Sequence, residues 1–424
     1  MNNKTSYVFI ISNSYKDKDW IYGNEFASLV VTAGYEPIGA LRQSVETPNP
    51  ATYVGKGFLD NVKEYLQLIP QKWPEITNIT IATDFDLTGT QRANIKKYLG
   101  VEVIDRTFVI LKIFENNAHS KEAKLQVDIA TLYWSKNHLI NKEGAYSQVT
   151  SGGGVHNKGS GEKQISLDRR HINLLIDTKK RELSKIKASR KNSRVKRNNS
   201  GLYKVAIVGY TNSGKSTLLN SLVAFGNGDK FVLSKNQQFA TLETSTREIS
   251  KFGYMKFLAT DTVGFIRDLP TTLVDAFRST LEEIKEADLL IHVVDISSPS
   301  FNEEIITTNE VLEEIGVKDI PSIYLLNKYD LLDKSLSQLL KDNEMYCSLL
   351  DGEDIEDIYR FICSSLAKKW EKYEIEFPYE HNFNEFTSDN YVENYYKNKN
   401  GYQCTVYFNP RTLYKYAYLL TKNS

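Results

Sequence analysis

A glycine-containing loop between an apolar strand and an apolar helix constrains the fold of this chain more than any other feature. The strand pattern Lys204–Val208 runs into GYTNSGKS at residues 209–216, and the helix pattern TLLNSLVA follows. Such loops point backbone N–H groups at phosphates, and the following helix adds its positive N-terminal end. We expect Lys215 to contact the outer phosphates and the Ser216 hydroxyl to bind Mg²⁺. The motif predicts a parallel α/β domain that binds a nucleotide.

Two further motifs follow in the order that a nucleotide switch needs. DTVG at residues 261–264 ends the strand MKFLAT, and we expect Asp261 to hold Mg²⁺ through water and the Gly264 amide to sense a γ-phosphate. NKYD at residues 327–330 ends the strand SIYLL. The Asp330 carboxylate would accept hydrogen bonds from N1–H and the 2-amino group of guanine, which adenine does not offer. The combination indicates a GTPase rather than an ATPase or a kinase.

Two other segments complete the predicted site. Ser348, with Leu349 beside it, follows the strand EMYC and is a candidate contact behind the base. The polar loop FATLETSTR at residues 239–247 suits a segment that γ-phosphate and Mg²⁺ order, in which one threonine donates a hydroxyl ligand. More than one threonine competes for that role, and the residue pattern alone leaves the choice open.

Composition narrows the class of protein. The chain has 424 residues, 41% of them hydrophobic and 25% charged, which is typical of a globular protein with more than one domain. Its three cysteines match no disulfide or metal-ligand spacing. We find neither a secretory signal pattern nor an apolar stretch of the roughly 20 residues that a membrane helix needs. We therefore expect a cytoplasmic protein.

The balanced total of 53 basic and 53 acidic residues hides one strongly basic segment. Residues 163–197 contain thirteen Lys and Arg against three Asp and Glu, a net charge of +10. A charge of this density on one element indicates contact with a polyanion. The alternative is a solvated helix face followed by a basic linker, which we place at Ala188–Gly201.

The chain divides into four predicted parts. Residues 1–116 alternate short strands (7–11, 79–83 and 101–104) with helices, as in a small α/β subdomain. Residues 117–198 form a long antiparallel helical hairpin with a Gly-rich tip at 151–163. The second helix of the hairpin carries the apolar stripe Ile172, Leu175, Ile176, Leu183 and Ile186. A GTPase domain of parallel strands with helices on both faces covers 199–371, and a small aromatic-rich α+β appendage covers 372–424.

The motifs together resemble the HflX family of ribosome-associated GTPases. The resemblance rests on GYTNSGKSTL, FATLETSTR, DTVGFIRDLP, LVDAFRSTLEE, HVVDISSP and NKYD. Upstream, NPATYVGKG, VIDRTFVILKIF, SKEAKLQVDIA, GGGVHNKGSGE and LDRR resemble the N-terminal domain of that family. The resemblance covers about residues 1–370.

The resemblance implies a function and a set of roles. Thr241 becomes the Mg²⁺-binding switch threonine. Family members bind the large (50S) ribosomal subunit, direct the hairpin tip towards the peptidyl transferase centre, and split stalled 70S ribosomes in the GTP state. In some lineages they confer resistance to ribosome-targeting antibiotics. We expect the same ribosomal partner here, contacted through ribosomal RNA and not through DNA. We also expect the protein to be a monomer and to act under stress.

The predicted residues fall into four groups. The GTP-binding group comprises Gly209, Tyr210, Thr211, Asn212, Ser213, Gly214, Lys215, Ser216, Thr217, Phe239, Ala240, Thr241, Leu242, Glu243, Asp261, Thr262, Val263, Gly264, Asn327, Lys328, Tyr329, Asp330, Ser348 and Leu349. Ser216, Thr241 and Asp261 are the metal-binding group, and Lys215 and Gly264 are the catalytic pair. The ribosome-contacting group is Gly153, Gly154, His156, Lys158, Arg169 and Arg170. The tip differs from the usual family pattern GGGIGTRGPGE, so its RNA contacts are expected to differ in detail.

Two expectations concern hydrolysis. Phe265 follows Gly264 where Ras-like enzymes place a water-orienting glutamine, and an apolar ring cannot align water by hydrogen bonding. We therefore expect slow intrinsic hydrolysis of GTP to GDP that a partner accelerates. Asn212 resembles the residue that helps to hold K⁺ in cation-activated GTPases, so K⁺ stimulation is a second hypothesis.

Two alternative functions remain. One is a GTP-regulated switch for subunit binding, assembly or dormancy that does not split ribosomes, and the other is action on a non-ribosomal partner.

Overall fold

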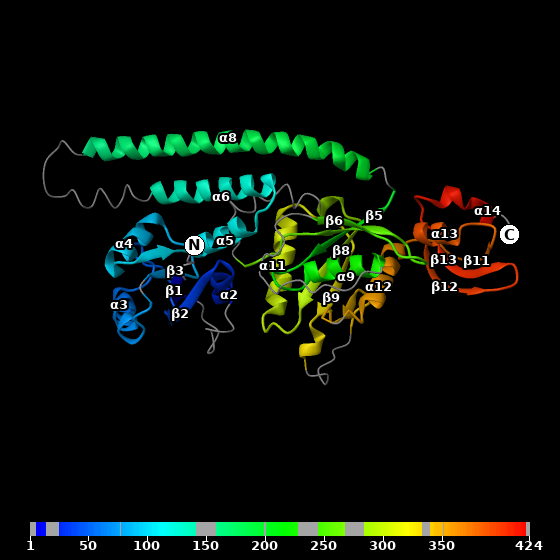
Figure 1. Cartoon of the computed structure of the whole chain (residues 1–424), viewed down its shortest axis with the longest axis horizontal. Helices are drawn as coiled ribbons and strands as arrows, with labels where there is room; N and C mark the ends of the chain where they lie inside the picture. The colour runs from blue at the N-terminus through cyan, green and yellow to red at the C-terminus, as the bar shows by residue number, and fades with distance from the viewer. Residues whose placement is uncertain are drawn as a thin grey trace. The chain divides into compact units, whose positions relative to one another are not determined.

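The computed structural model describes residues 6–13, 25–76, 78–140, 158–198, 201–227, 245–267, 284–332, 340–350 and 352–420 (Figure 1). They divide into two compact units, the first ending at Ala188 and the second beginning at Ser189. No helix among these residues is long and apolar enough to cross a membrane.

The first unit contains a parallel sheet with the strand order β2-β1-β3-β4. Its strands are β1 (Ser6–Ser12), β2 (Tyr35–Arg42), β3 (Ile79–Thr83) and β4 (Glu102–Ile104). Its helices are α2 (Glu25–Thr32), α3 (Lys56–Lys72), α4 (Gly89–Leu99) and α5 (Arg106–Asn117). The predicted strands near 7–11, 79–83 and 101–104 are confirmed, whereas β2 and α3 were not predicted.

Two long helices, α6 (Lys121–Ile140) and α8 (Lys158–Asn198), lie side by side in Figure 1. Leu125 and Ile129 of α6 pack against Leu183 of α8. The predicted apolar stripe is wrong at Leu175, which is 37% exposed. In the same turn of the helix it is Ile176 that is buried. The hairpin is thus held by a narrow apolar seam.

The ends of α8 differ from the prediction. The Gly-rich tip was expected to reach Lys163, but the helix begins at Lys158. The linker expected at Ala188–Gly201 is wrong as well, since the helix continues to Asn198. Ala, Lys and Arg are good helix formers, so this segment favours a helix even though it has few large apolar residues.

The second unit contains a six-stranded sheet with the order β10-β9-β8-β5-β7-β6. Its strands are β5 (Tyr203–Val208), β6 (Ser245–Ile249), β7 (Phe257–Asp261), β8 (Leu289–Asp295), β9 (Ser322–Asn327) and β10 (Glu344–Tyr346). Among the described strands of this sheet, only β6 is antiparallel to its neighbour. Its helices include α9 (Lys215–Asn227), α11 (Phe301–Glu314) and α12 (Ile355–Ala367). One core joins α9 and α12 to the sheet, with Leu222, Phe257, Ile291 and Tyr359 fully buried.

A small antiparallel sheet, β11-β13-β12, ends the described chain. Its elements are β11 (Lys372–Pro378), α13 (Phe383–Asp389), β12 (Tyr391–Lys397), β13 (Gly401–Tyr407) and α14 (Ala417–Leu420). Phe377, Phe386 and Phe408 lie in its own apolar core. The α/β class, with a parallel nucleotide-binding sheet and an α+β appendage, is as predicted.

Candidate nucleotide site

The predicted motifs meet at one edge of the six-stranded sheet. The carboxyl ends of β5, β7, β8, β9 and β10 lie along this edge, because these strands are parallel. Open α/β sheets bind ligands at the carboxyl ends of their strands. The loop after β5, the aspartate that ends β7 and the asparagine that ends β9 therefore converge.

The loop after β5 has a backbone that only glycine permits at two positions. Gly209 has a φ of 144°, and a Cβ there would lie 2.3 Å from the Val293 carbonyl oxygen. Gly214 has a φ of 108°, and a Cβ there would lie 2.4 Å from the Asn327 amide nitrogen. Asn212 also has a positive φ, of 62°. The loop is thus packed directly against the strands that carry the other motifs.

Lys215 begins α9 and is buried, with only 6% of the residue exposed. Its ammonium group donates a hydrogen bond to the main-chain oxygen of Tyr210 within the same loop. Burial lowers the pKa of Lys215 to about 8, while the charges of Asp261 and Glu304 act in the opposite direction. A bound phosphate would favour the charged form of this amine.

The two described members of the metal group are in contact. Ser216 Oγ donates a hydrogen bond of 2.8 Å to Asp261 Oδ2, and Asp261 is 1% exposed. A hydroxyl and a carboxylate are hard oxygen ligands of the kind that Mg²⁺ prefers, so the residues present fit that ion. Among the described residues, no cluster of three or more His, Cys, Asp or Glu offers a different metal site.

The DTVG segment is joined to the phosphate loop through the backbone. The Thr211 amide donates to the Phe265 carbonyl at 2.7 Å, and the Phe265 amide donates to the Gly209 carbonyl at 3.1 Å. A Cβ on Gly264 would lie 3.0 Å from both Lys215 Nζ and Thr211 Cα, so a side chain has little room there. The Phe265 ring is 1% exposed and lies in the core.

Asn327 connects the phosphate loop to the loop after β10. Its amide nitrogen donates 2.8 Å to the Ser213 carbonyl, and its amide oxygen accepts from the Leu349 amide at 3.2 Å. Both bonds are buried, and Asn327 itself is 3% exposed. This residue therefore holds two loops of the site in register.

The remaining residues of NKYD follow the end of β9. Lys328 adopts a left-handed backbone with φ of 64° and forms an ion pair with Asp295 at the end of β8. Asp330 is exposed at the surface, and the Tyr329 ring stacks on Tyr346 with centroids 4.7 Å apart. An exposed carboxylate at a strand end is accessible to the edge of a base.

Two positioning residues were missed by the sequence reasoning. Asp354 accepts a hydrogen bond of 2.7 Å from the Ser348 amide and thereby shapes the loop after β10. Asp295 pairs with Lys328 and also accepts from the Ser297 amide at 3.1 Å. Its place at the end of the apolar strand LLIHVV, in line with Asp261 and Asn327, was the signal that could have found Asp295.

Some predicted residues lie outside the described residues, namely Phe239, Ala240, Thr241, Leu242, Glu243, Gly153, Gly154 and His156. Of the other ribosome-contacting candidates, Lys158 begins α8, and Arg169 and Arg170 lie further along the same helix. Thr217, Thr262 and Val263 lie beside the phosphate-loop residues already described, and Thr262 Oγ1 donates to the Ile207 carbonyl at 2.7 Å.

Three family models match successive parts of the chain. Residues 22–115 match the N-terminal region of a GTP-binding GTPase, residues 117–197 match the middle region, and residues 204–328 match a 50S ribosome-binding GTPase. The GTPase HflX of Caldanaerobacter subterraneus subsp. tengcongensis is 39% identical over 379 residues, which is 89% of this chain and 84% of the relative. The chain belongs to the HflX family.

Other members of the HflX family match over similar lengths. The GTPase HflX of Lacrimispora saccharolytica is 36% identical over 84% of this chain and 82% of the relative. Among solved structures, a GTP-binding protein from Sulfolobus solfataricus in complex with GDP is 25% identical, with a TM-score of 0.44, covering 86% of this chain and 99% of that one. Because the chain belongs to the HflX family and residues 204–328 match a GTPase family model, it is a GTPase, and the predicted resemblance is confirmed.

Proposed function

We propose that this HflX-family GTPase binds the large ribosomal subunit in its GTP state and separates stalled ribosomes into subunits under stress. The observation that carries the proposal is the match of residues 204–328 to a 50S ribosome-binding GTPase. Guanine, phosphates and Mg²⁺ would meet at the carboxyl edge of the sheet, where the site residues converge.

The contacts of the loop after β5 support a role for the triphosphate end of the nucleotide. Mg²⁺, held by Ser216 and Asp261, would neutralise charge on the phosphate oxygens. Lys215 would exchange its bond to the Tyr210 carbonyl for a phosphate oxygen. The Gly264 amide would report the γ-phosphate, because Gly264 lies against Lys215 and is followed by a residue bound to the loop.

The buried Phe265 ring supports slow hydrolysis by the isolated protein. The ring lies in the core and has no group that could align the attacking water. A partner that reorders the segment after Gly264 would therefore accelerate the reaction. The GTP state would then persist until the protein docks on its partner.

The helical hairpin supports contact with ribosomal RNA. Lys179 and Lys180 of α8 are directed to α6, where they bind Asp128 (2.6 Å) and the Tyr133 hydroxyl (2.7 Å). Arg170, by contrast, is exposed. Part of the basic charge therefore joins the two helices, and the exposed part is available to phosphate groups.

Light scattering by purified 70S ribosomes tests the splitting step. With a non-hydrolysable GTP analogue, the protein should lower the scattered intensity as subunits separate, whereas the GDP-loaded protein should leave it unchanged. Constant scattering with protein bound in the GTP state would contradict splitting and would support the alternative of a binding switch. Lys215→Ala, which should not bind nucleotide, serves as the control.

A further inference from the structure

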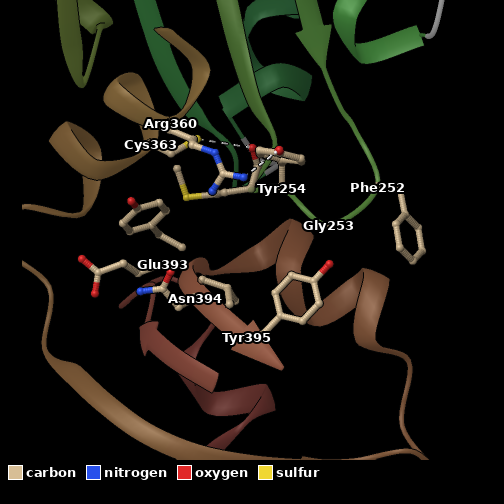
Figure 2. A pocket seen from close by; sticks show the side chains of 11 residues that line it. Phe252, Gly253, Tyr254, Arg360, Cys363, Glu393, Asn394 and Tyr395 are labelled. Carbon is tan, nitrogen blue, oxygen red and sulfur yellow. Dashed lines mark hydrogen bonds between the residues drawn. The ribbon is translucent and has the colours of Figure 1, made fainter. Parts of the chain in front are cut away.

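A pocket of about 220 Å³ lies where the GTPase sheet meets the C-terminal sheet (Figure 2). The turn between β6 and β7 forms one wall, α12 forms a second, and β12 forms the third. Its volume is several times the roughly 30 Å³ that one water occupies in the liquid, so a heteroaromatic ring fits. None of the described residues of the predicted nucleotide site lines it.

The walls of this pocket are fixed to one another. The Lys256 amide donates to the Ser388 carbonyl at 3.0 Å, which joins the β6–β7 side to the end of α13. Arg411, in the turn after β13, binds Asp288 at 2.6 Å and lies over the Tyr203 ring at 3.9 Å. The pocket is therefore a formed feature of this unit.

Two exposed aromatic side chains line the pocket. Phe252, at the turn between β6 and β7, is 71% exposed, and Tyr395 of β12 is 47% exposed. In Figure 2 the Tyr395 ring lies between the Asn394 side chain and the Phe252 ring. Two exposed rings at one pocket offer flat faces on which a planar group can stack.

The charged groups of the pocket are already neutralised by neighbours. Arg360 binds Glu356 and the Tyr254 hydroxyl, each at 3.0 Å. Glu393 binds Lys372 at 2.8 Å. The exposed Asn394 amide, which can both donate and accept, supplies a neutral polar edge. This lining suits a flat, uncharged ring with hydrogen-bonding edges, and it suits a phosphate or an ammonium group poorly.

We propose that this pocket binds one unstacked nucleobase of RNA, with the ring stacked on Phe252 and Tyr395 and its edge read by Asn394. Single-stranded bases in folded RNA are recognised by such stacking and edge contacts. The proposal rests on the proposed function, because the RNA would be that of the bound ribosomal subunit. It adds a second contact, made by residues outside the helical hairpin.

A single-stranded RNA heptamer with a central 2-aminopurine tests the pocket, because stacking on aromatic rings quenches its fluorescence. The full-length protein is titrated in about 0.3 M KCl, because salt at this concentration weakens binding that depends only on phosphate contacts. The unaltered protein should quench saturably. Phe252→Ala should weaken binding about tenfold, as loss of one stacking ring does. GTP turnover without ribosomes should not change.

Tyr414→Ala is the matched control, since Tyr414 is a 76% exposed ring in the short 3-10 helix Leu413–Lys415 after β13 and does not line the pocket. It should bind the heptamer within twofold of the unaltered protein. Absence of saturable quenching, or equal losses in both variants, would overturn the proposal. Tighter, Phe252-dependent binding of N-acetyltryptophanamide would also overturn it, in favour of a protein partner. Co-sedimentation with subunits separates the two proposals: if it persists while the heptamer fails to bind, only the pocket is refuted.

Discussion

Asn327 donates a hydrogen bond of 2.8 Å to the main-chain oxygen of Ser213, 114 residues earlier in the chain. Through the same side chain it also accepts from Leu349, so one amide links the phosphate loop to the loop after β10. Asn327, which is predicted to contact the nucleotide, therefore also holds the protein loops around it.

Replacing Asn327 by Ala should weaken GDP and GTP alike. Two buried hydrogen bonds are lost and their partners are left unpaired, at a cost of about 1–3 kcal/mol, or roughly five- to 150-fold in affinity. Calorimetric titration with GDP measures the effect. Asn309→Ala, at an exposed position of α11, should bind GDP normally. Equal affinity in both variants would show that the Asn327 contacts do not support the site.

The Asp330 carboxylate should determine the choice of base. Asp330→Asn replaces an acceptor of hydrogen bonds by an amide, so guanine nucleotides should lose about a hundredfold or more in affinity while xanthine nucleotides gain. Competition between GDP and XDP for the same protein measures the preference. Asp319→Asn, exposed in the loop before β9, is the control and should keep the guanine preference. An unchanged preference in Asp330→Asn would place the base elsewhere.

Nucleotide affinity should fall at alkaline pH. Burial lowers the pKa of Lys215 to about 8 in the empty site. Above that pH the amine is neutral and must take up a proton when phosphates bind, so GDP affinity should drop about tenfold between about pH 7 and about pH 9. Lys215→Arg keeps its charge over this range, so whatever affinity it retains should not depend on pH. A flat profile for the unaltered protein would contradict this linkage.

The sequence motifs predicted which residues come together at the carboxyl edge of the sheet, because each motif follows or ends a parallel strand. Lys215, Asp261 and Asn327 each follow or end a short apolar run, and parallel topology brings such ends together. The contacts of Asp354 could not be predicted in this way, because it meets the Ser348 amide only through the path of the loop after β10.

The omission of β2 in the first unit has a physical cause as well. Strand β2 is interrupted by Pro37 and Gly39 and has no fully buried residue, so it lacks an alternating pattern. A Cβ at Gly39 would lie 2.8 Å from the Phe9 ring, which explains a glycine inside the strand. Helix α3, by contrast, buries Leu59, Val62, Leu66 and Ile69 at spacings of three and four, so its apolar pattern was readable from the sequence, and Pro70 marks only the end of the helix.

Potassium should stimulate hydrolysis if Asn212 helps to hold a cation beside the phosphates. GTP turnover should then be several-fold faster in KCl than in NaCl at equal ionic strength. Because Asn212 has a φ of 62°, Asn212→Gly removes the side chain without straining the backbone, and it should abolish the difference. Equal turnover of the unaltered protein in the two salts would dismiss the cation site.

Sedimentation with purified large ribosomal subunits tests the central claim most directly. The protein should travel with the subunit when it is loaded with a non-hydrolysable GTP analogue and should stay near the top of the gradient with GDP. Lys215→Ala should stay there in both cases, and rising salt should release the bound protein steeply, since several phosphate contacts are proposed. Failure of the GTP-analogue form to associate with the subunit at low salt would contradict the account.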